Sequence, residues 1–215
     1  MSEELRLVAE EASTCVRCGL AATRTQVVFG VGDPAADLLF VGEGPGAEED
    51  RLGQPFVGRS GKLLDQLVLE EMGLTRDQFH IANVVKCRPP GNRDPLPDEI
   101  AACNPWLERQ LELIAPKVVI TLGNFATRTL LQTREGITKI RGQVYPFRGG
   151  VLIPTFHPAA ILRGGATQMA QMRADLVRAK QAIQAATAAP AAPPPVAPAV
   201  APAVAPAADD ATLFD

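Results

Sequence analysis

The four cysteines have the most specific spacing of any residues in the sequence. Cys15 and Cys18 form a C-x2-C pair, whereas fifteen residues separate Cys87 from Cys103. Four thiolates that include such a pair are typical of a metal site, either zinc or an iron–sulfur cluster. Buried structural thiols are the alternative, since free cysteine is often buried. The spacing therefore indicates a metal site and leaves the metal open.

A glycine-rich turn, GEGPGA (42–47), follows an apolar run. Gly42, Gly44 and Gly46 indicate a sharp bend or a close approach of the backbone to another group, and Glu43 places a carboxylate in the turn. The pattern loosely fits a dinucleotide-binding fingerprint. However, we expect no helix directly after the turn, and the acidic run 48–50 has the wrong charge for a pyrophosphate. A nucleotide cofactor is therefore disfavoured.

Three other side chains could bind or react with a ligand. Phe56 lies in a second glycine-rich loop, where it either packs in a small satellite core or offers its ring as a stacking platform. Asn83 interrupts an apolar strand, where its amide must find hydrogen-bond partners, and an amide also matches the edge of a nucleic-acid base. His157 ends another apolar strand, as a core or capping residue or as a functional group. His80 is expected to be structural.

Alternating strands and helices must position these residues. Strands are expected over 37–43, 80–86, 117–123, 143–148 and 151–158, and helices over 61–73, 97–116, 124–132 and 167–185. This alternation predicts an α/β fold with a parallel sheet covered by helices on both faces. Ligands of such sheets bind at the carboxyl ends of the strands. The glycine turn, Asn83 and His157 all follow or end strands, so we expect them to meet there.

Composition is that of a soluble globular protein, with 47% hydrophobic and 21% charged residues. No apolar run reaches the ~18 residues typical of a membrane span, and the N-terminus lacks a signal-peptide pattern. A cytoplasmic protein with reduced thiols is expected. The net charge of −3 comes from three aspartates in the last thirty residues, which contain no Lys or Arg. The balanced remainder neither supports nor excludes a nucleic-acid partner.

Taken in order, the segments GEGPG, AEEDR, GQPFVGRSG, ANVVKCRPPGNR, ITLGNFA and TFHPAAILR strongly resemble the family 4 uracil-DNA glycosylases over about residues 10 to 180. The resemblance implies a three-layer α/β/α fold with a mainly parallel four-stranded sheet. It implies a [4Fe-4S] cluster on Cys15, Cys18, Cys87 and Cys103. It also implies a monomeric, nucleoid-associated enzyme of base excision repair that flips deoxyuridine out of DNA, hydrolyses its N-glycosidic bond and leaves an abasic site.

The resemblance also implies roles for single residues. Phe56 stacks on uracil, Asn83 pairs with N3–H and O4, and His157 donates to O2. The turn of Gly42, Gly44 and Gly46 approaches the deoxyribose and the C5 side of the base. Glu43 lies near C1′, where it orients or deprotonates the attacking water or stabilises the sugar cation. In the HPAAILR segment Ile161, or almost equally Leu162, wedges into the duplex, and Arg163 lies near a phosphate.

Two alternatives concern the reaction. A related iron–sulfur group attaches covalently to uracil-DNA through a histidine in the loop after the second strand, and VVKCRPPGNRDPLPDE contains no histidine. Hydrolysis is therefore favoured over attachment. No lysine lies in the active-site motifs to form a Schiff base, so no lyase step is expected. A non-catalytic binder of uracil-containing DNA is the second alternative.

The C-terminal region changes composition abruptly. Residues 1–185 are expected to form the glycosylase domain, 186–208 a disordered Pro/Ala-rich linker and 209–215 a possible partner-binding peptide. The last residues, DDATLFD, loosely resemble bacterial sliding-clamp-binding peptides, with Leu213–Phe214 as the apolar pair and Asp210 where a glutamine is usual. A solubilising tail without a partner is the alternative.

Overall fold

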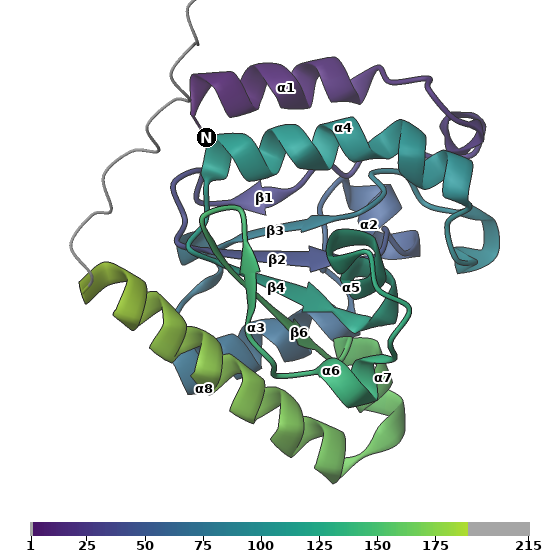
Figure 1. Ribbon diagram of the computed structural model, residues 1–215. Helices are drawn as coiled ribbons and strands as arrows, with labels where there is room; N and C mark the ends of the chain where they lie inside the picture. Colours follow the sequence, from purple (N-terminus) through teal and green to yellow (C-terminus); the bar gives the residue numbers. More distant parts are fainter. Residues whose placement is uncertain (1, 189–215) are drawn as a thin grey trace, which may run out of the picture.

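A computed structural model describes residues 2–188 of the chain. A six-stranded sheet in the order β1-β3-β2-β4-β6-β5 lies between two layers of helices, with α1 and α4 on one face and α3 and α8 on the other (Figure 1). The strands are β1 (Val31–Gly32), β2 (Leu38–Gly42), β3 (His80–Asn83), β4 (Val118–Leu122), β5 (Tyr145–Phe147) and β6 (Gly150–Thr155). The α-helices are α1 (Glu3–Ser13), α2 (Ala47–Leu52), α3 (Arg59–Met72), α4 (Pro97–Ile114), α5 (Gly123–Leu131), α6 (Ile137–Ile140), α7 (Pro158–Gly164) and α8 (Ala166–Ala188).

The four central strands are parallel, and their carboxyl ends lie at one edge of the sheet. Gly42 at the end of β2 is in register with Asn83 at the end of β3, and Leu122 of β4 is in register with Thr155 of β6. The three-layer α/β/α prediction is confirmed. The predicted number of four strands holds only for this parallel part, because β1 and β5 add short antiparallel strands at the two edges.

The central strands form because their side chains are apolar on both faces, as a sheet covered on both sides requires. In β2, Leu38 and Phe40 pack into the core under α3 and α8, whereas Leu39 and Val41 pack into the core under α1 and α4. All five residues of β2 and all five of β4 are buried. This double burial fixes the register, because a shift by one residue would exchange the two faces.

Several predicted boundaries differ from the structure. The predicted strand 151–158 ends at Thr155, and His157 is the N-cap of helix α7, which the strand pattern did not predict. A short helix, α2, begins at Ala47, so the expectation that no helix follows the glycine turn is wrong. Strand β3 ends at Asn83 rather than at residue 86. Helix α8 continues to Ala188, so the first three residues of the predicted linker are helical. The rest of the linker and the peptide 209–215 lie outside the described residues.

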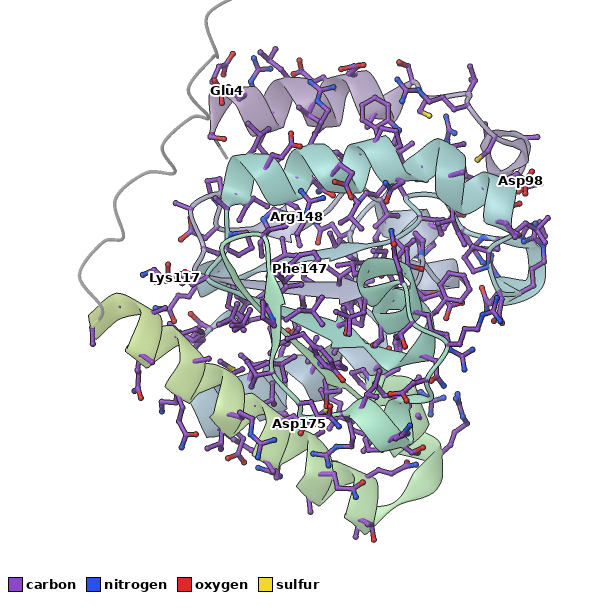
Figure 2. All side chains as sticks on the ribbon, viewed as in Figure 1. Glu4, Asp98, Lys117, Phe147, Arg148 and Asp175 are labelled. Atoms are coloured by element: carbon purple, nitrogen blue, oxygen red, sulfur yellow. The ribbon has the colours of Figure 1, made fainter. Side chains whose placement is uncertain are left out.

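The end of β6 is fastened to α8 by a buried carboxylate. Asp175, labelled in Figure 2, accepts a hydrogen bond of 2.7 Å from the Thr155 hydroxyl and also pairs with Arg141. This contact holds the end of β6 two residues before His157. Among residues 2–188, no helix has the length and apolarity needed to cross a membrane.

Candidate functional site: a cleft at the strand ends and a cavity of four cysteines

A cleft of about 730 Å³ opens at the carboxyl ends of the parallel strands. This is within the roughly 300–1,000 Å³ usual for small-molecule sites. The predicted residues that line it are Glu43 and Gly46 of the turn after β2, Phe56 of the loop before α3, Asn83 at the end of β3 and His157 at the N-cap of α7. The structure therefore brings the predicted pocket residues together where the strand pattern placed them.

Asn83 carries a polar group without a partner. Its side chain is only 1% exposed, and its Oδ1 has no hydrogen-bond partner among the described residues. Gly42 makes room for this amide, because a Cβ at position 42 would lie 2.4 Å from Oδ1. Buried polar atoms are nearly always paired, so an orphaned amide that lines a cleft indicates a group that binds a ligand.

Phe56 is held in an unusual backbone conformation. Its φ of 55° is in the left-handed region, which non-glycine residues rarely adopt. Gly61 permits this approach, because a Cβ there would lie 1.7 Å from the Phe56 carbonyl oxygen. The Phe56 ring is buried beside His157, with ring centroids 5.6 Å apart. The loop thus presents an aromatic surface at a fixed position in the cleft.

Glu49 fixes this loop, and sequence reasoning did not find it. Its Oε1 accepts hydrogen bonds of 3.1 Å from the main-chain N–H groups of Val57 and Gly58. Gly58 is the N-cap of α3 and has no side chain of its own to cap the helix. Glu49 therefore acts as a remote cap, and the bare glycine N-cap is the only sequence signal that could have suggested one.

The rest of the acidic run has structural partners as well. Glu48 pairs with Arg51 on the surface of α2 at 2.8 Å. Asp50 is buried, and its Oδ1 accepts a hydrogen bond of 2.9 Å from the Thr25 amide. The acidic run thus organises the loops around the glycine turn.

His157 is a neutral hydrogen-bond donor near neutral pH. Its Nδ1 accepts a hydrogen bond of 3.1 Å from the Ala159 amide, so the proton of the neutral ring is on Nε2. Burial, aided by the positive charge of Arg163, lowers the pKa of His157 to about 4. Gly123 makes room for the residue, because a Cβ there would lie 3.1 Å from the His157 Cβ.

Glu43 has a raised proton affinity. Burial, with a smaller contribution from the negative charge of Asp94, raises the pKa of Glu43 to about 7. Asp94 also lines the cleft, from the loop after Cys87. A carboxyl group with a pKa near the working pH can accept a proton from water. The role of Asp94 was not predicted, because the residue lies fifty-one positions from Glu43 in an irregular loop.

The predicted duplex wedge needs a correction. Ile161 is only 4% exposed and belongs to the core, so it does not reach the surface where a wedge must lie. Its neighbour Leu162 is 52% exposed. Arg163 is exposed and lines the cleft. Leu162 and Arg163 therefore remain as surface candidates.

The four cysteines line one cavity between α1, the loop after β3 and α4, here called the cysteine cavity. Three N–H groups point at sulfurs: Trp106 Nε1 lies 3.4 Å from Cys15 Sγ, the Lys86 amide 3.2 Å from Cys103 Sγ and Arg24 3.6 Å from Cys87 Sγ. Within residues 2–188, no group of three or more Cys, His, Asp or Glu is placed to hold a single metal ion.

His80 lies apart from both sites. It is buried, its Nδ1 lies 3.3 Å from the Asp33 carbonyl oxygen, and burial lowers its pKa to about 4. It does not line the cleft. The structural role predicted for His80 fits this position.

Comparison with known proteins gives consistent matches. A model of the uracil DNA glycosylase superfamily matches residues 29–179. The type-4 uracil-DNA glycosylase of Sulfurisphaera tokodaii is 47% identical over 168 residues, which cover 74% of this chain and 76% of the relative. The type-4 enzyme of Thermotoga maritima is 44% identical over 85% of this chain and 96% of its own length. A type-5 uracil-DNA glycosylase of Thermus thermophilus is 35% identical over 59% of this chain and 62% of its own.

Proposed function

Because the chain belongs to the uracil DNA glycosylase superfamily and to its type-4 members, we propose that it removes uracil from DNA by hydrolysing the N-glycosidic bond. The observation that carries the proposal is the orphaned Asn83 amide in a cleft that also contains Phe56, His157 and Glu43. An enzyme that acts on a base in DNA must take the base out of the stack and read its Watson–Crick edge in a pocket. The cleft offers an aromatic surface, an amide and a donor for that task.

In this proposal three side chains recognise the base. Uracil stacks on Phe56, its N3–H donates to the Asn83 Oδ1 and its O4 accepts from the Asn83 Nδ2. Cytosine presents the opposite donor and acceptor at these two positions, so it leaves the buried amide unpaired, which costs free energy. Gly42 supports this role because a Cβ at that position would collide with the amide oxygen. The Gly44 and Gly46 backbone borders the deoxyribose and the C5 side of the base.

Bond cleavage relies on charge stabilisation and on water. The C1′–N1 bond breaks with its electron pair moving to uracil, and the Nε2–H of His157 donates to O2 as the negative charge develops. A water adds its oxygen to C1′ of the sugar cation. The Glu43 carboxylate orients this water and accepts its proton. The uracil anion then takes up a proton from solvent, and Glu43 returns its proton to solvent, so the products are free uracil and an abasic site. The described cleft is lined by no lysine, which supports hydrolysis without a lyase step.

The cysteine cavity is proposed to hold a [4Fe-4S] cluster with a structural role. Four thiols line one cavity, which supports a shared metal group. Cys15, Cys18, Cys87 and Cys103 would hold the cluster. The three N–H groups near the sulfurs suit thiolates.

DNA contacts outside the pocket are proposed for Leu162 and Arg163. Leu162 fills the space that the flipped nucleotide leaves in the duplex, and Arg163 binds a phosphate.

The enzyme acts as a monomer at the chromosomal DNA of the cytoplasm. The peptide 209–215 binds a sliding clamp through Leu213 and Phe214, which raises the local concentration of enzyme at DNA. Titration of a peptide of residues 205–215 against the clamp tests this, with Leu213→Ala/Phe214→Ala as the control that must not bind.

Release of free uracil tests the proposed activity. Wild-type protein incubated with DNA that contains deoxyuridine should release uracil, and the same DNA with thymine or cytosine should release no base. Glu43→Gln separates an enzyme from a non-catalytic binder. If Glu43 serves catalysis, this variant releases uracil about 10²- to 10⁴-fold more slowly while it binds the DNA with nearly unchanged affinity. Equal losses of release and of binding would contradict the assigned role.

A further inference from the structure

Lys86 is a fully buried lysine that the proposed reaction does not use. It lies directly before Cys87 and is only 1% exposed. Its Nζ donates a hydrogen bond of 2.9 Å to the main-chain oxygen of Asn83 and a second one to Gln110 Oε1. It also lies 5.6 Å from the centroid of the Phe29 ring. The amine is thus held between the end of β3 and α4.

Burial of an amine costs free energy that an apolar residue would avoid, and lysine is almost never fully buried without a partner. The partner found here is fixed by the fold. Gln110 is itself buried on α4, and its Nε2 donates a hydrogen bond of 3.0 Å to the Phe29 carbonyl oxygen. Gln110 is therefore held in place on α4. The Lys86 amine, which is bonded to Gln110, in turn fixes the position of the Asn83 carbonyl oxygen.

The main chain of Lys86 reaches the cysteine cavity. Its N–H donates to Cys103 Sγ at 3.2 Å, and its carbonyl oxygen accepts a hydrogen bond of 2.7 Å from the Val28 amide. Strand β3 ends at Asn83, although the Val84 and Val85 amides still donate to the Gly42 and Glu43 carbonyl oxygens. Lys86 therefore connects the two sites. Its main chain contacts a sulfur of the cysteine cavity, and its side chain contacts the main-chain oxygen of Asn83.

We infer that Lys86 is a positioning residue: its side chain fixes the Asn83 backbone, and so aims the Asn83 amide at the base, from an anchor in the cysteine cavity. The inference rests on the proposed function of Asn83. The direction of a side chain depends on the backbone that carries it, and a site that is loose by about 1 Å loses much of its binding. The Lys86–Asn83 bond adds a side-chain restraint at the Asn83 carbonyl oxygen to the main-chain bonds that Val84 and Val85 make with the glycine turn.

A double-mutant cycle on the metal-loaded protein tests the inference. Lys86→Met removes the amine and keeps an unbranched apolar stem, whereas Gln110→Met removes the second bond of the amine and leaves the Lys86–Asn83 bond. The measured quantity is the Kd for an oligonucleotide that contains 2′-fluorinated deoxyuridine, which resists hydrolysis. We expect Lys86→Met to weaken binding about tenfold, but less than twofold in the Asn83→Ala background. Gln110→Met, which loosens the anchor of the amine but keeps its bond to Asn83, should weaken binding by a smaller factor than Lys86→Met.

The visible absorption of the bound metal group per protein is recorded for each variant. It should stay at the wild-type value in Lys86→Met, since only the main chain of Lys86 reaches a sulfur. Equal weakening in the wild-type and Asn83→Ala backgrounds, or weakening that follows loss of absorption, would overturn the inference. If Lys86→Met does not fold, Lys86→Gln enters the same cycle with the same expectation and a smaller loss. Wild-type protein that neither binds nor cleaves uracil-DNA would instead refute the proposed function.

Discussion

The rings of Phe56 and His157 lie with their centroids 5.6 Å apart and their planes inclined by 32°. This separation is that of two aromatic rings in contact with each other. The two side chains therefore form one continuous wall of the cleft, rather than two walls of a slot. A base that stacks on Phe56 would meet His157 from its edge, where the Nε2–H can reach a carbonyl oxygen.

Phe56→Leu should lower the affinity for uracil-DNA while it leaves the stability of the fold largely unchanged. Leucine keeps most of the apolar contact in the core but loses the flat ring, so the affinity for uracil-DNA should fall by about 10-fold or more, in line with the ~1–3 kcal/mol of base–aromatic stacking. The Tm should change little in comparison with Phe56→Ala. Binding measured with the 2′-fluorinated oligonucleotide checks this. An unchanged Kd would remove Phe56 from the base site.

Glu43 should make uracil release depend on pH. Its carboxylate accepts a proton, and its pKa is raised to about 7, so the single-turnover rate should rise with pH through about 7. Asp94→Asn removes a neighbouring negative charge, lowers the pKa of Glu43 and should move this rise to lower pH. Asp98→Asn, on the first turn of α4 (Figure 2), is the control that should leave the profile unchanged.

The free energy of unfolding should fall with rising pH as Glu43 ionises, whereas the rate of uracil release rises. The folded state holds the Glu43 proton more tightly than the unfolded chain, whose ordinary pKa is 4.5. The contribution of Glu43 to stability is therefore complete below that value and is lost as the pH rises through about 7. Glu43→Gln should remove this part of the pH dependence, as measured by denaturant unfolding between pH 4 and pH 8. An unchanged slope would mean that Glu43 is not buried as described.

His157→Ala should slow uracil release about 10²- to 10³-fold, as loss of a single donor to a developing anion does. Because the pKa of His157 is lowered to about 4, the donor stays neutral across the range in which Glu43 ionises. The wild-type rate should therefore show no fall near pH 6.5 from loss of a histidine proton. Asn83→Asp should also slow release, since it places a negative carboxylate beside O4. Wild-type single-turnover rates in both variants would show that the pocket is elsewhere.

The cysteine cavity predicts brown protein with broad absorption in the violet and about four irons per chain. Cys15→Ala or Cys103→Ala should lose the colour and much of the thermal stability, because the proposed cluster would tie the segment after α1 to α4 and to the loop after β3. Metal analysis and visible spectra of anaerobically purified protein check this. Colourless, zinc-containing and fully active protein would contradict the cluster.

Much of the site could be predicted because parallel strands end at one edge of a sheet. The glycine turn, Asn83 and His157 needed only the strand pattern to be placed together. Glu49, Asp94 and Lys86 were not found, because their partners are backbone groups or distant loops, which leave no periodic signal. Ile161 was chosen over Leu162 because a shift of one residue on a helix, about 100° of rotation, exchanges the core face for the surface.

Alkali treatment of a uracil-containing oligonucleotide tests the central claim most directly. A labelled strand with one deoxyuridine is incubated with metal-loaded protein and analysed on a denaturing gel with and without alkali. The account predicts a break at the uracil position only after alkali, and no break in matched strands with thymine or cytosine. An intact uracil strand after alkali would contradict uracil hydrolysis, and a break without alkali would contradict the absence of a lyase step.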